Sequence, residues 1–213
     1  MKVRLVLNSK SASVVLMADG RGRRLRALHV IAMQQGGYFS AAQAKGVGYS
    51  YQGQAHHVAA GNWQRVGRGI FRLADEPAEI HDEMFQWMLW SKGRAVVSHE
   101  SALEVHDVGE LESKRVHLTV PPGLAMRHRA VVLHQATIAA RDIDRRNRFP
   151  VTTVLRSVID VAALRADEDQ LARVIDEALK GGHFTVRQLR ERSEVVDLKG
   201  ALRIERALHW IDA

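Results

Sequence analysis

The spacing of apolar residues predicts two helices near the start of the chain. Apolar side chains recur at helical intervals over residues 23–35. The glycine pair at 36–37 ends this helix, because glycine readily adopts the positive φ of a helix C-terminus. Ser40 and Gln43 have the spacing of a capping box. The pattern therefore predicts a short second helix after Ser40.

A third helix and a β-hairpin follow. Ser50 is a suitable N-cap for a helix that reaches about residue 60. Residues 63–73 predict two short strands around Gly67-Arg68-Gly69. Helix, short helix, turn, helix and hairpin, in this order, are typical of a winged helix-turn-helix domain, whose third helix enters the major groove of DNA.

The remaining two thirds of the chain mix short strands with helices. Strand-like segments are residues 95–97, 115–120 and 130–134. Helical apolar patterns or capping signals cover residues 81–91, 98–105, 153–162 and 167–180, a segment from 185, and residues 201–211. We therefore expect an α+β protein, with a winged helix-turn-helix domain followed by a mixed α+β domain.

This pattern divides the chain into three segments. Residues 21–76 form the predicted DNA-binding domain, and residues 77–213 form the α+β domain. Residues 1–20 are an N-terminal extension with two alternative explanations. Either they form an additional hairpin, with strands at 3–7 and 14–17, or translation begins at Met17.

The positive charge of the chain is concentrated in one segment. The 213 residues contain 31 Lys+Arg and 24 Asp+Glu, for a formal net charge of +7. Between Arg21 and Arg72 there are eight basic residues and no acidic residue, while the part after Arg72 is close to neutral. A solvated surface normally mixes both signs of charge. The segment is therefore interpreted as a contact surface for a polyanion, most commonly nucleic acid.

Composition excludes several other classes. The absence of cysteine excludes a disulfide framework, a thiolate metal site and a cysteine nucleophile. No apolar run approaches the ~20 residues that a membrane helix needs. Lys2 and Arg4 make the N-terminus basic, but Asn8, Ser9 and Lys10 interrupt its apolar stretch, which makes it a poor signal peptide. We expect a cytoplasmic protein.

The third helix is the candidate recognition helix. Steps of 100° per residue place Tyr51, Ala55 and Val58 on one face, which we expect to lie in the core. Glutamine suits the N6/N7 edge of adenine, and histidine reaches a base acceptor or a phosphate. Gly53 either permits close approach of the backbone to DNA or is an unspecialised surface position. The face expected to meet DNA consists of Gln52, Gly53, His56 and His57, with Gln54 on the flank.

Contacts to phosphates are expected from the neighbouring elements, because the third helix contains no lysine or arginine. The arginines at the start of the first helix and those of the hairpin are the candidates. The complete set of predicted DNA-contacting residues is Arg23, Arg24, Ser40, Gln43, Ser50, Gln52, Gly53, Gln54, His56, His57, Arg65, Arg68 and Arg72.

The sequence indicates no catalytic residue, no metal and no cofactor, so the protein is not expected to be an enzyme. His56 and His57 are adjacent and diverge by 100° on a helix, so they do not chelate one ion. Ser98-His99-Glu100 has the residue types of a hydrolase triad but lacks a GxSxG elbow. His117, His134 and Asp160 are of metal-ligating types, yet no nuclease-like Glu-x-Lys motif follows the strands. Nucleotide-binding glycine motifs are also absent.

Several segments resemble AbiEi-type antitoxins. Residues 36–44 (GGYFSAAQA) and 61–73 (GNWQRVGRGIFRL) are similar to the N-terminal domain of that family. Residues 97–103 (VSHESAL), 116–121 (VHLTVP) and 152–160 (TTVLRSVID) resemble its C-terminal domain. The fragments occur in the family's order. The chain departs from the family pattern in its N-terminal extension and in a recognition helix without basic residues.

The resemblance implies a component of a bacterial type IV toxin–antitoxin system. Such a protein represses its own operon by binding inverted repeats in duplex DNA through the winged helix. Its C-terminal domain counteracts a nucleotidyltransferase-like toxin without a stable complex. One alternative is a stand-alone winged-helix repressor whose second domain senses a ligand or mediates assembly. Another is a nucleic-acid-processing enzyme that uses the winged helix for targeting.

Overall fold

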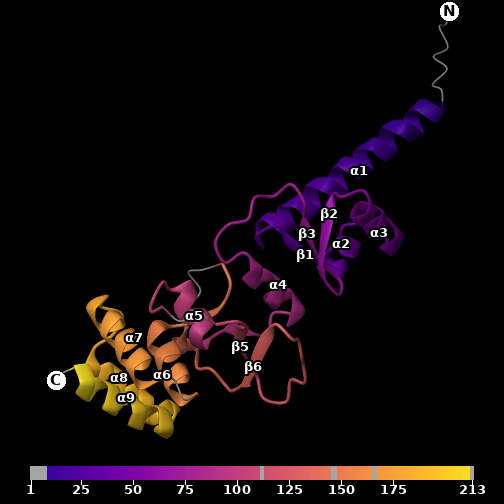
Figure 1. The fold of residues 1–213 in the computed structure, drawn as a ribbon. Coiled ribbons are helices and arrows are strands. Elements are labelled where there is room, and N and C mark those ends of the chain that lie inside the picture. The colour runs from indigo at the N-terminus through magenta and orange to yellow at the C-terminus, as the bar shows by residue number, and fades with distance from the viewer. Residues whose placement is uncertain (1–8, 111–112, 145–147, 165–166, 212–213) are drawn as a thin grey trace, which may run out of the picture. The chain divides into compact units, whose positions relative to one another are not determined.

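The protein consists of two compact units, Met1–Trp90 and Ser91–Ala213 (Figure 1). Each unit contains helices and a sheet, so the predicted α+β fold class is confirmed. Across the described stretches, no helix is both long and apolar enough to cross a membrane. The computed structural model describes four stretches of the chain, with side chains from residue 20 onward: 9–110, 113–144, 148–164 and 167–211.

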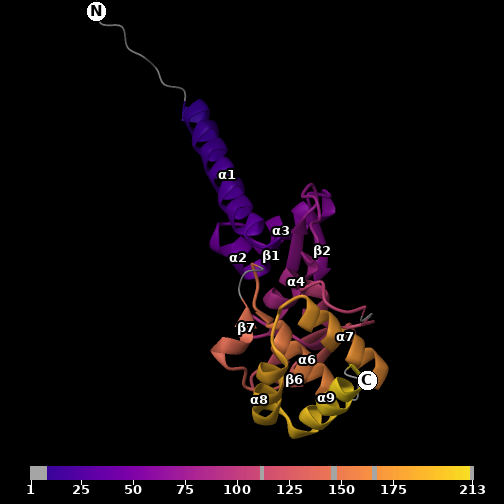
Figure 2. The same cartoon turned by 90° about the vertical axis from the view of Figure 1, so that its left-hand side faces the viewer.

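The N-terminal unit begins with a helix that is longer than predicted. α1 covers Ser9–Met33, whereas the apolar spacing predicted a helix over residues 23–35. Residues 14–17 therefore lie in a helix, and the hairpin predicted as one alternative for the extension is wrong; its other strand, 3–7, lies outside the described residues. The C-terminal part of α1 packs into the core through Leu28 and Ala32. The N-terminal part extends beyond the rest of the unit (Figures 1 and 2).

Two short helices follow, and their capping residues act as predicted. α2 is Ala41–Gly46 and α3 is Tyr51–Ala59. The Ser40 hydroxyl accepts the Gln43 backbone N–H at 3.1 Å, and the Gln43 side chain accepts the Ser40 N–H at 2.8 Å. Ser50 Oγ accepts the Gly53 N–H at 3.1 Å. These bonds satisfy N–H groups that a helix N-terminus otherwise leaves without partners.

An antiparallel sheet of order β1-β3-β2 completes the core of this unit. β2 (Trp63–Gly67) and β3 (Ile70–Leu73) form the predicted hairpin, and Gly69 in its turn has a φ of 68°. β1 (Tyr38–Ser40) was not predicted; it pairs with β3 along its whole length. β3 is therefore the central strand. Phe39, Trp63 and Phe71 pack together beneath it, with ring centroids 4.8–5.8 Å apart.

The boundary between the units lies later than predicted. α4 (Glu83–Trp90) buries Met84, Phe85 and Trp87 and contacts all three strands of the first sheet. The division therefore falls after Trp90 rather than after Glu76. The return of acidic residues at 75–76 marks the end of the cationic surface, but the apolar face of α4 extends the domain beyond it.

The C-terminal unit is built on a mixed sheet of order β6-β5-β4-β8-β7. β4 pairs antiparallel with β5 and parallel with β8, while β5 pairs parallel with β6. The predicted strands are confirmed to within two residues, and β7 and β8 are additional. The strands are β4 (Val96–Val97), β5 (Val116–Val120), β6 (Val131–Gln135), β7 (Ile143–Asp144) and β8 (Val151–Thr152).

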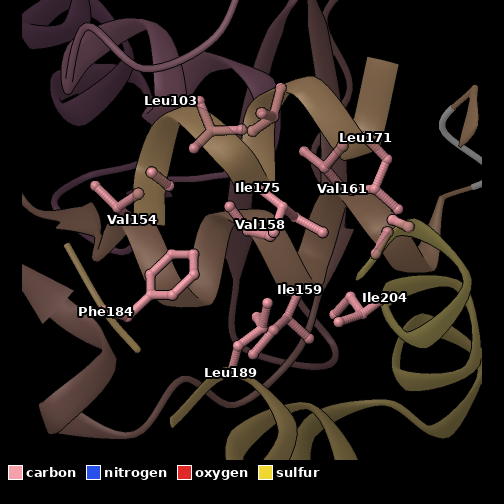
Figure 3. Close-up of a cluster of buried hydrophobic side chains, with 14 of the residues drawn as sticks. Leu103, Val154, Val158, Ile159, Val161, Leu171, Ile175, Phe184, Leu189 and Ile204 are labelled. Carbon is pink, nitrogen blue, oxygen red and sulfur yellow. The ribbon is translucent and has the colours of Figure 1, made fainter. Parts of the chain in front are cut away.

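Five α-helices in the described part of this unit enclose an apolar core. α6 is the central one: Val154, Val158 and Ile159 point from it into a cluster with α7 and α9 (Figure 3). Leu189 from α8 and Ile204 from α9 are fully buried in the same cluster. The helices are α5 (His99–Val105), α6 (Val154–Ala163), α7 (Glu168–Lys180), α8 (Val186–Val196) and α9 (Leu198–Ile211).

A buried ion-pair cluster fixes α6 to its neighbours. Arg156 is 7% exposed; its Nε donates to Asp160 Oδ1 at 2.8 Å and its Nη1 to Asp142 Oδ2 at 3.2 Å. Arg192 of α8 donates to both oxygens of Asp142. Burial raises the pKa of Asp160 to about 6, although the nearby Arg156 charge lowers it. Removal of one partner from such a cluster leaves a buried charge uncompensated.

We expect Arg156→Met to lower the free energy of unfolding by about 3–5 kcal/mol, the range for breaking a buried ion pair. The matched control is Lys180→Met, which breaks the ion pair of Lys180 with Asp176 at the same i,i+4 spacing on an exposed surface. Urea denaturation followed by circular dichroism measures both variants. Equal effects of the two substitutions would contradict the structural role assigned to Arg156.

Candidate functional site

The exposed cations of the N-terminal unit lie in a stretch of chain without carboxylates. Residues 21–74 contain no Asp or Glu. No carboxylate of this stretch offsets their charge, so these side chains make its surface positive. The exposed members are Arg21, Arg23, Arg24, Arg26, Lys45, Arg65 and Arg68.

A groove of about 620 Å³ lies between α1 and α3. It is lined by guanidinium groups, imidazoles and the capped N-terminus of α3, where backbone N–H groups favour an anion. The sequence did not predict the contribution of Arg21. The lining includes Arg21 and Arg24 from α1, with Ser50, Gly53, His56 and His57 from the α3 segment.

The turn before α3 holds this groove in place. Gly48 has a φ of 101°, and a Cβ at this position would approach Arg24 Cδ to 2.8 Å. Arg24 also lies over the Tyr49 ring, 5.9 Å from its centroid, and Tyr49 is buried in the core. Only glycine therefore fits at residue 48, and the contact with Tyr49 fixes Arg24 beside the start of α3.

The exposed face of α3 agrees only in part with the prediction. Gln52 and His56 are exposed and Gly53 is half-buried. A Cβ on Gly53 would meet only the Ser50 hydroxyl, at 3.4 Å, so packing between described residues does not require glycine there. Tyr51 was expected in the core, but it is 63% exposed and Lys45 Nζ lies 5.2 Å from its ring centroid.

The prediction for Gln54 is wrong. Gln54 is 3% exposed, and its Nε2 donates to the backbone carbonyls of Ala41, at 3.0 Å, and Tyr49, at 3.1 Å. The amide thus connects α2 and the turn to α3 and is not free to contact a base. The spacing of apolar residues gave the wrong buried face for α3, because the side chain that packs inward is the polar Gln54, which satisfies two buried carbonyl groups.

His57 is positioned by the core and is less accessible than predicted. Its ring stacks on Trp63, with centroids 4.7 Å apart and an interplanar angle of 13°. The Asn62 Nδ2 amide lies 3.2 Å from His57 Nδ1 and, as a donor, leaves the proton of the neutral ring on Nε2. Burial lowers the pKa of His57, and His56 and Arg21 lower it further. The ring is therefore a neutral donor at the edge of the groove.

The hairpin presents two of its three arginines to solvent. Arg65 and Arg68 are exposed, and Arg65 lies over the Phe71 ring at 5.3 Å from the centroid. The prediction for Arg72 is wrong: it is 9% exposed, and its Nη2 donates to the carbonyls of Glu76 and Pro77, both at 2.9 Å. Because β1 makes β3 a central strand, Arg72 faces Tyr38 instead of solvent.

The other predicted residues divide by role. Arg23 is exposed on α1. Ser40, Gln43 and Ser50 all use their side chains as caps, and Gln43 also donates to Gln35 Oε1 at 3.1 Å. Their positions depend on these internal bonds, so any contact with DNA is secondary to capping.

A second cluster was not predicted by the sequence analysis. His99, His117 and His134, which are widely separated along the chain, lie together in the C-terminal unit. His117 and His134 come side by side because β5 pairs with β6 in the register His117↔Val132 and Thr119↔His134, and because side chains alternate between the two faces of each strand. The sequence signal was limited to residue type.

Comparison with known proteins identifies the fold alone. No family model and no curated protein matches the sequence. Among solved structures, the RV2827C protein from Mycobacterium tuberculosis superposes with a TM-score of 0.60 and 12% sequence identity. The match covers 88% of this chain and 76% of that chain. At this identity the similarity shows a shared fold and nothing beyond it.

We expect Gln54→Ala to lower the free energy of unfolding by about 1–3 kcal/mol, because the carbonyls of Ala41 and Tyr49 lose their buried donor. Gln52→Ala, on the exposed face of the same helix, is the control and should leave stability nearly unchanged. Thermal unfolding of both variants checks the expectation. Equal melting temperatures would contradict the structural role assigned to Gln54.

Proposed function

We propose that the N-terminal unit is a winged helix-turn-helix domain that binds duplex DNA and represses transcription. The groove between α1 and α3 is the observation that carries the proposal, because it combines arginines, hydrogen-bonding side chains and a helix N-terminus in a stretch without carboxylates. The element order helix, helix, helix and hairpin supports the same function.

The positions of the side chains suggest how DNA is bound. Gln52 and His56 are the exposed side chains of α3 that suit base edges in the major groove. Gly53 permits the helix to approach closely, since no contact within the described chain needs a glycine there. Arg21 and Arg24 on one side and Arg65 and Arg68 on the hairpin supply phosphate contacts.

We further propose that the protein acts as an antitoxin. The ordered resemblance of both halves to AbiEi-type proteins supports this function. It implies repression of the protein's own operon at inverted repeats, and protection from a nucleotidyltransferase-like toxin without a stable complex. The division into two compact units supports separate locations for the two activities.

DNA binding is expected to depend steeply on salt. Each phosphate contact adds about −0.9 to the slope of log K against log salt, so four to six contacts give roughly −4 to −5. Arg65→Ala and Arg68→Ala should each reduce the magnitude of this slope by about one. Fluorescence anisotropy with an operator duplex at several salt concentrations measures the slope.

Arg187→Ala is the matched control for this measurement, because Arg187 is an exposed arginine of the C-terminal unit. Its slope should equal that of the unchanged protein. If the hairpin variants also keep that slope, Arg65 and Arg68 do not contact the DNA backbone.

Antitoxin activity is tested separately from repression. The toxin, taken as the product of the reading frame adjacent to this gene, is expressed from an unrelated promoter so that repression does not affect its level. The Arg65→Ala/Arg68→Ala protein should bind the operator more weakly but restore growth as fully as the unchanged protein, since both substitutions lie in the N-terminal unit. Growth measured with the unchanged protein, the variant and no antitoxin decides the result. Failure of the unchanged protein to restore growth would exclude antitoxin function and leave the repressor function.

A further inference from the structure

The three histidines of the C-terminal unit converge from separate elements. His99 is the first residue of α5, His117 lies on β5 and His134 on β6. One ring nitrogen from each lies within 4.8 Å of those of the other two. His99 and His117 are buried and His134 is half-buried. Three imidazoles in one partly enclosed place form a ligand set for a transition metal.

The closest pair has the separation of two ligands on one ion. His134 Nε2 lies 3.2 Å from His117 Nδ1. Two nitrogens bound to a tetrahedral zinc ion at 2.0–2.1 Å lie about 3.3 Å apart. These two nitrogens are thus spaced for a shared ion.

A carboxylate oxygen lies beside one of the three rings. Glu100 Oε2 is 2.8 Å from His117 Nδ1, yet this buried atom makes no hydrogen bond of normal geometry among the described residues. A buried carboxylate oxygen without a proper donor is costly. The short distance and the missing hydrogen bond both suit two metal ligands, Glu100 Oε2 and His117 Nδ1, that face a common cation. Glu100 is therefore the candidate fourth ligand, and its charge offsets part of the charge of the ion.

Outer contacts fix the orientation of His99. The Ser98 hydroxyl lies 2.9 Å from His99 Nδ1 and accepts the Thr119 hydroxyl at 2.8 Å. Ser98 occupies the N-cap position of α5, but its side chain makes no capping bond. With Nδ1 bonded to Ser98, Nε2 is the nitrogen left to bind an ion. Metal-bound histidines commonly make such a second bond.

The backbone at His99 is strained. His99 has a φ of 56°, in the left-handed region that costs a non-glycine residue roughly 1–3 kcal/mol. The conformation places its ring against His134, with centroids 3.6 Å apart and an interplanar angle of 18°. Ring stacking explains the approach of His99 to His134 but not the convergence of His117 and Glu100. A common ion would account for the convergence of His117 and Glu100 with the stacked pair once the stacked rings turn toward it.

We propose that His99, His117, His134 and Glu100 bind one Zn²⁺ ion, which connects the start of α5 to β5 and β6. Three nitrogens and one carboxylate oxygen suit zinc, which accepts both donor types in tetrahedral geometry. The zinc site belongs to the C-terminal unit and the proposed DNA-binding groove to the N-terminal unit, so loss of either function leaves the other intact.

Isothermal titration of the full chain with ZnCl₂ tests the proposal. The protein carries no histidine tag and is first treated with a chelator that is then removed. We expect one ion per chain and a rise in melting temperature on binding. His134→Gln and His99→Gln should each weaken binding at least about a hundredfold, beyond the usual loss for an outer contact. Ser98→Ala should weaken it about ten- to a hundredfold.

His209→Gln is the control, because His209 is an exposed histidine of α9 outside the cluster. It should bind zinc like the unchanged protein. Co²⁺ provides a second readout: its visible absorption reports tetrahedral coordination, which the His134 variant should lose. Circular dichroism shows which variants fold. If His99→Gln does not fold, His134→Gln decides the result, because His134 is only half-buried. Absence of saturable binding by the unchanged protein, or binding that survives in folded His134→Gln, would overturn the proposal.

Discussion

The pairing of β1 with β3 is the constraint on which the N-terminal unit depends. It makes β3 a central strand, so Phe71 faces the aromatic core on one side and Arg72 faces Tyr38 on the other. The guanidinium of Arg72 then satisfies the carbonyls of Glu76 and Pro77. The outer strand β2 and its turn keep Arg65 and Arg68 in solvent. The backbone hydrogen bonds between β1 and β3 therefore lead to the burial of Arg72, whereas Arg65 and Arg68 stay exposed.

The surface proposed to bind DNA depends equally on interactions beneath it. Gln54 fixes α3 through two carbonyls, Tyr49 supports Arg24, and Trp63 supports His57. Exposed side chains next to fixed ones lose less conformational entropy when they bind a partner. The buried residues of this unit thus contribute to recognition by positioning the exposed ones.

In the C-terminal unit, charged and polar groups are buried at two places with different arrangements. Around Arg156, guanidinium and carboxylate groups neutralise each other through direct bonds. Around His117, three imidazoles lie together and one carboxylate lies beside His117. In the first arrangement every carboxylate is paired with an arginine, although Asp160 Oδ2 makes no hydrogen bond among the described residues, whereas the second has the composition of a ligand set.

Local sequence determined the helices after α1, the caps at Ser40, Ser50 and Thr185, and the hairpin turn, because each depends on neighbours within a few residues. It did not predict the N-terminal extent of α1. The carboxylate-free cationic segment was likewise visible in the sequence alone. Tertiary structure alone decided the burial of Gln54 and Arg72, since their partners come from other elements. It also decided the meeting of His99, His117 and His134, because strand pairing sets the register that joins distant residues.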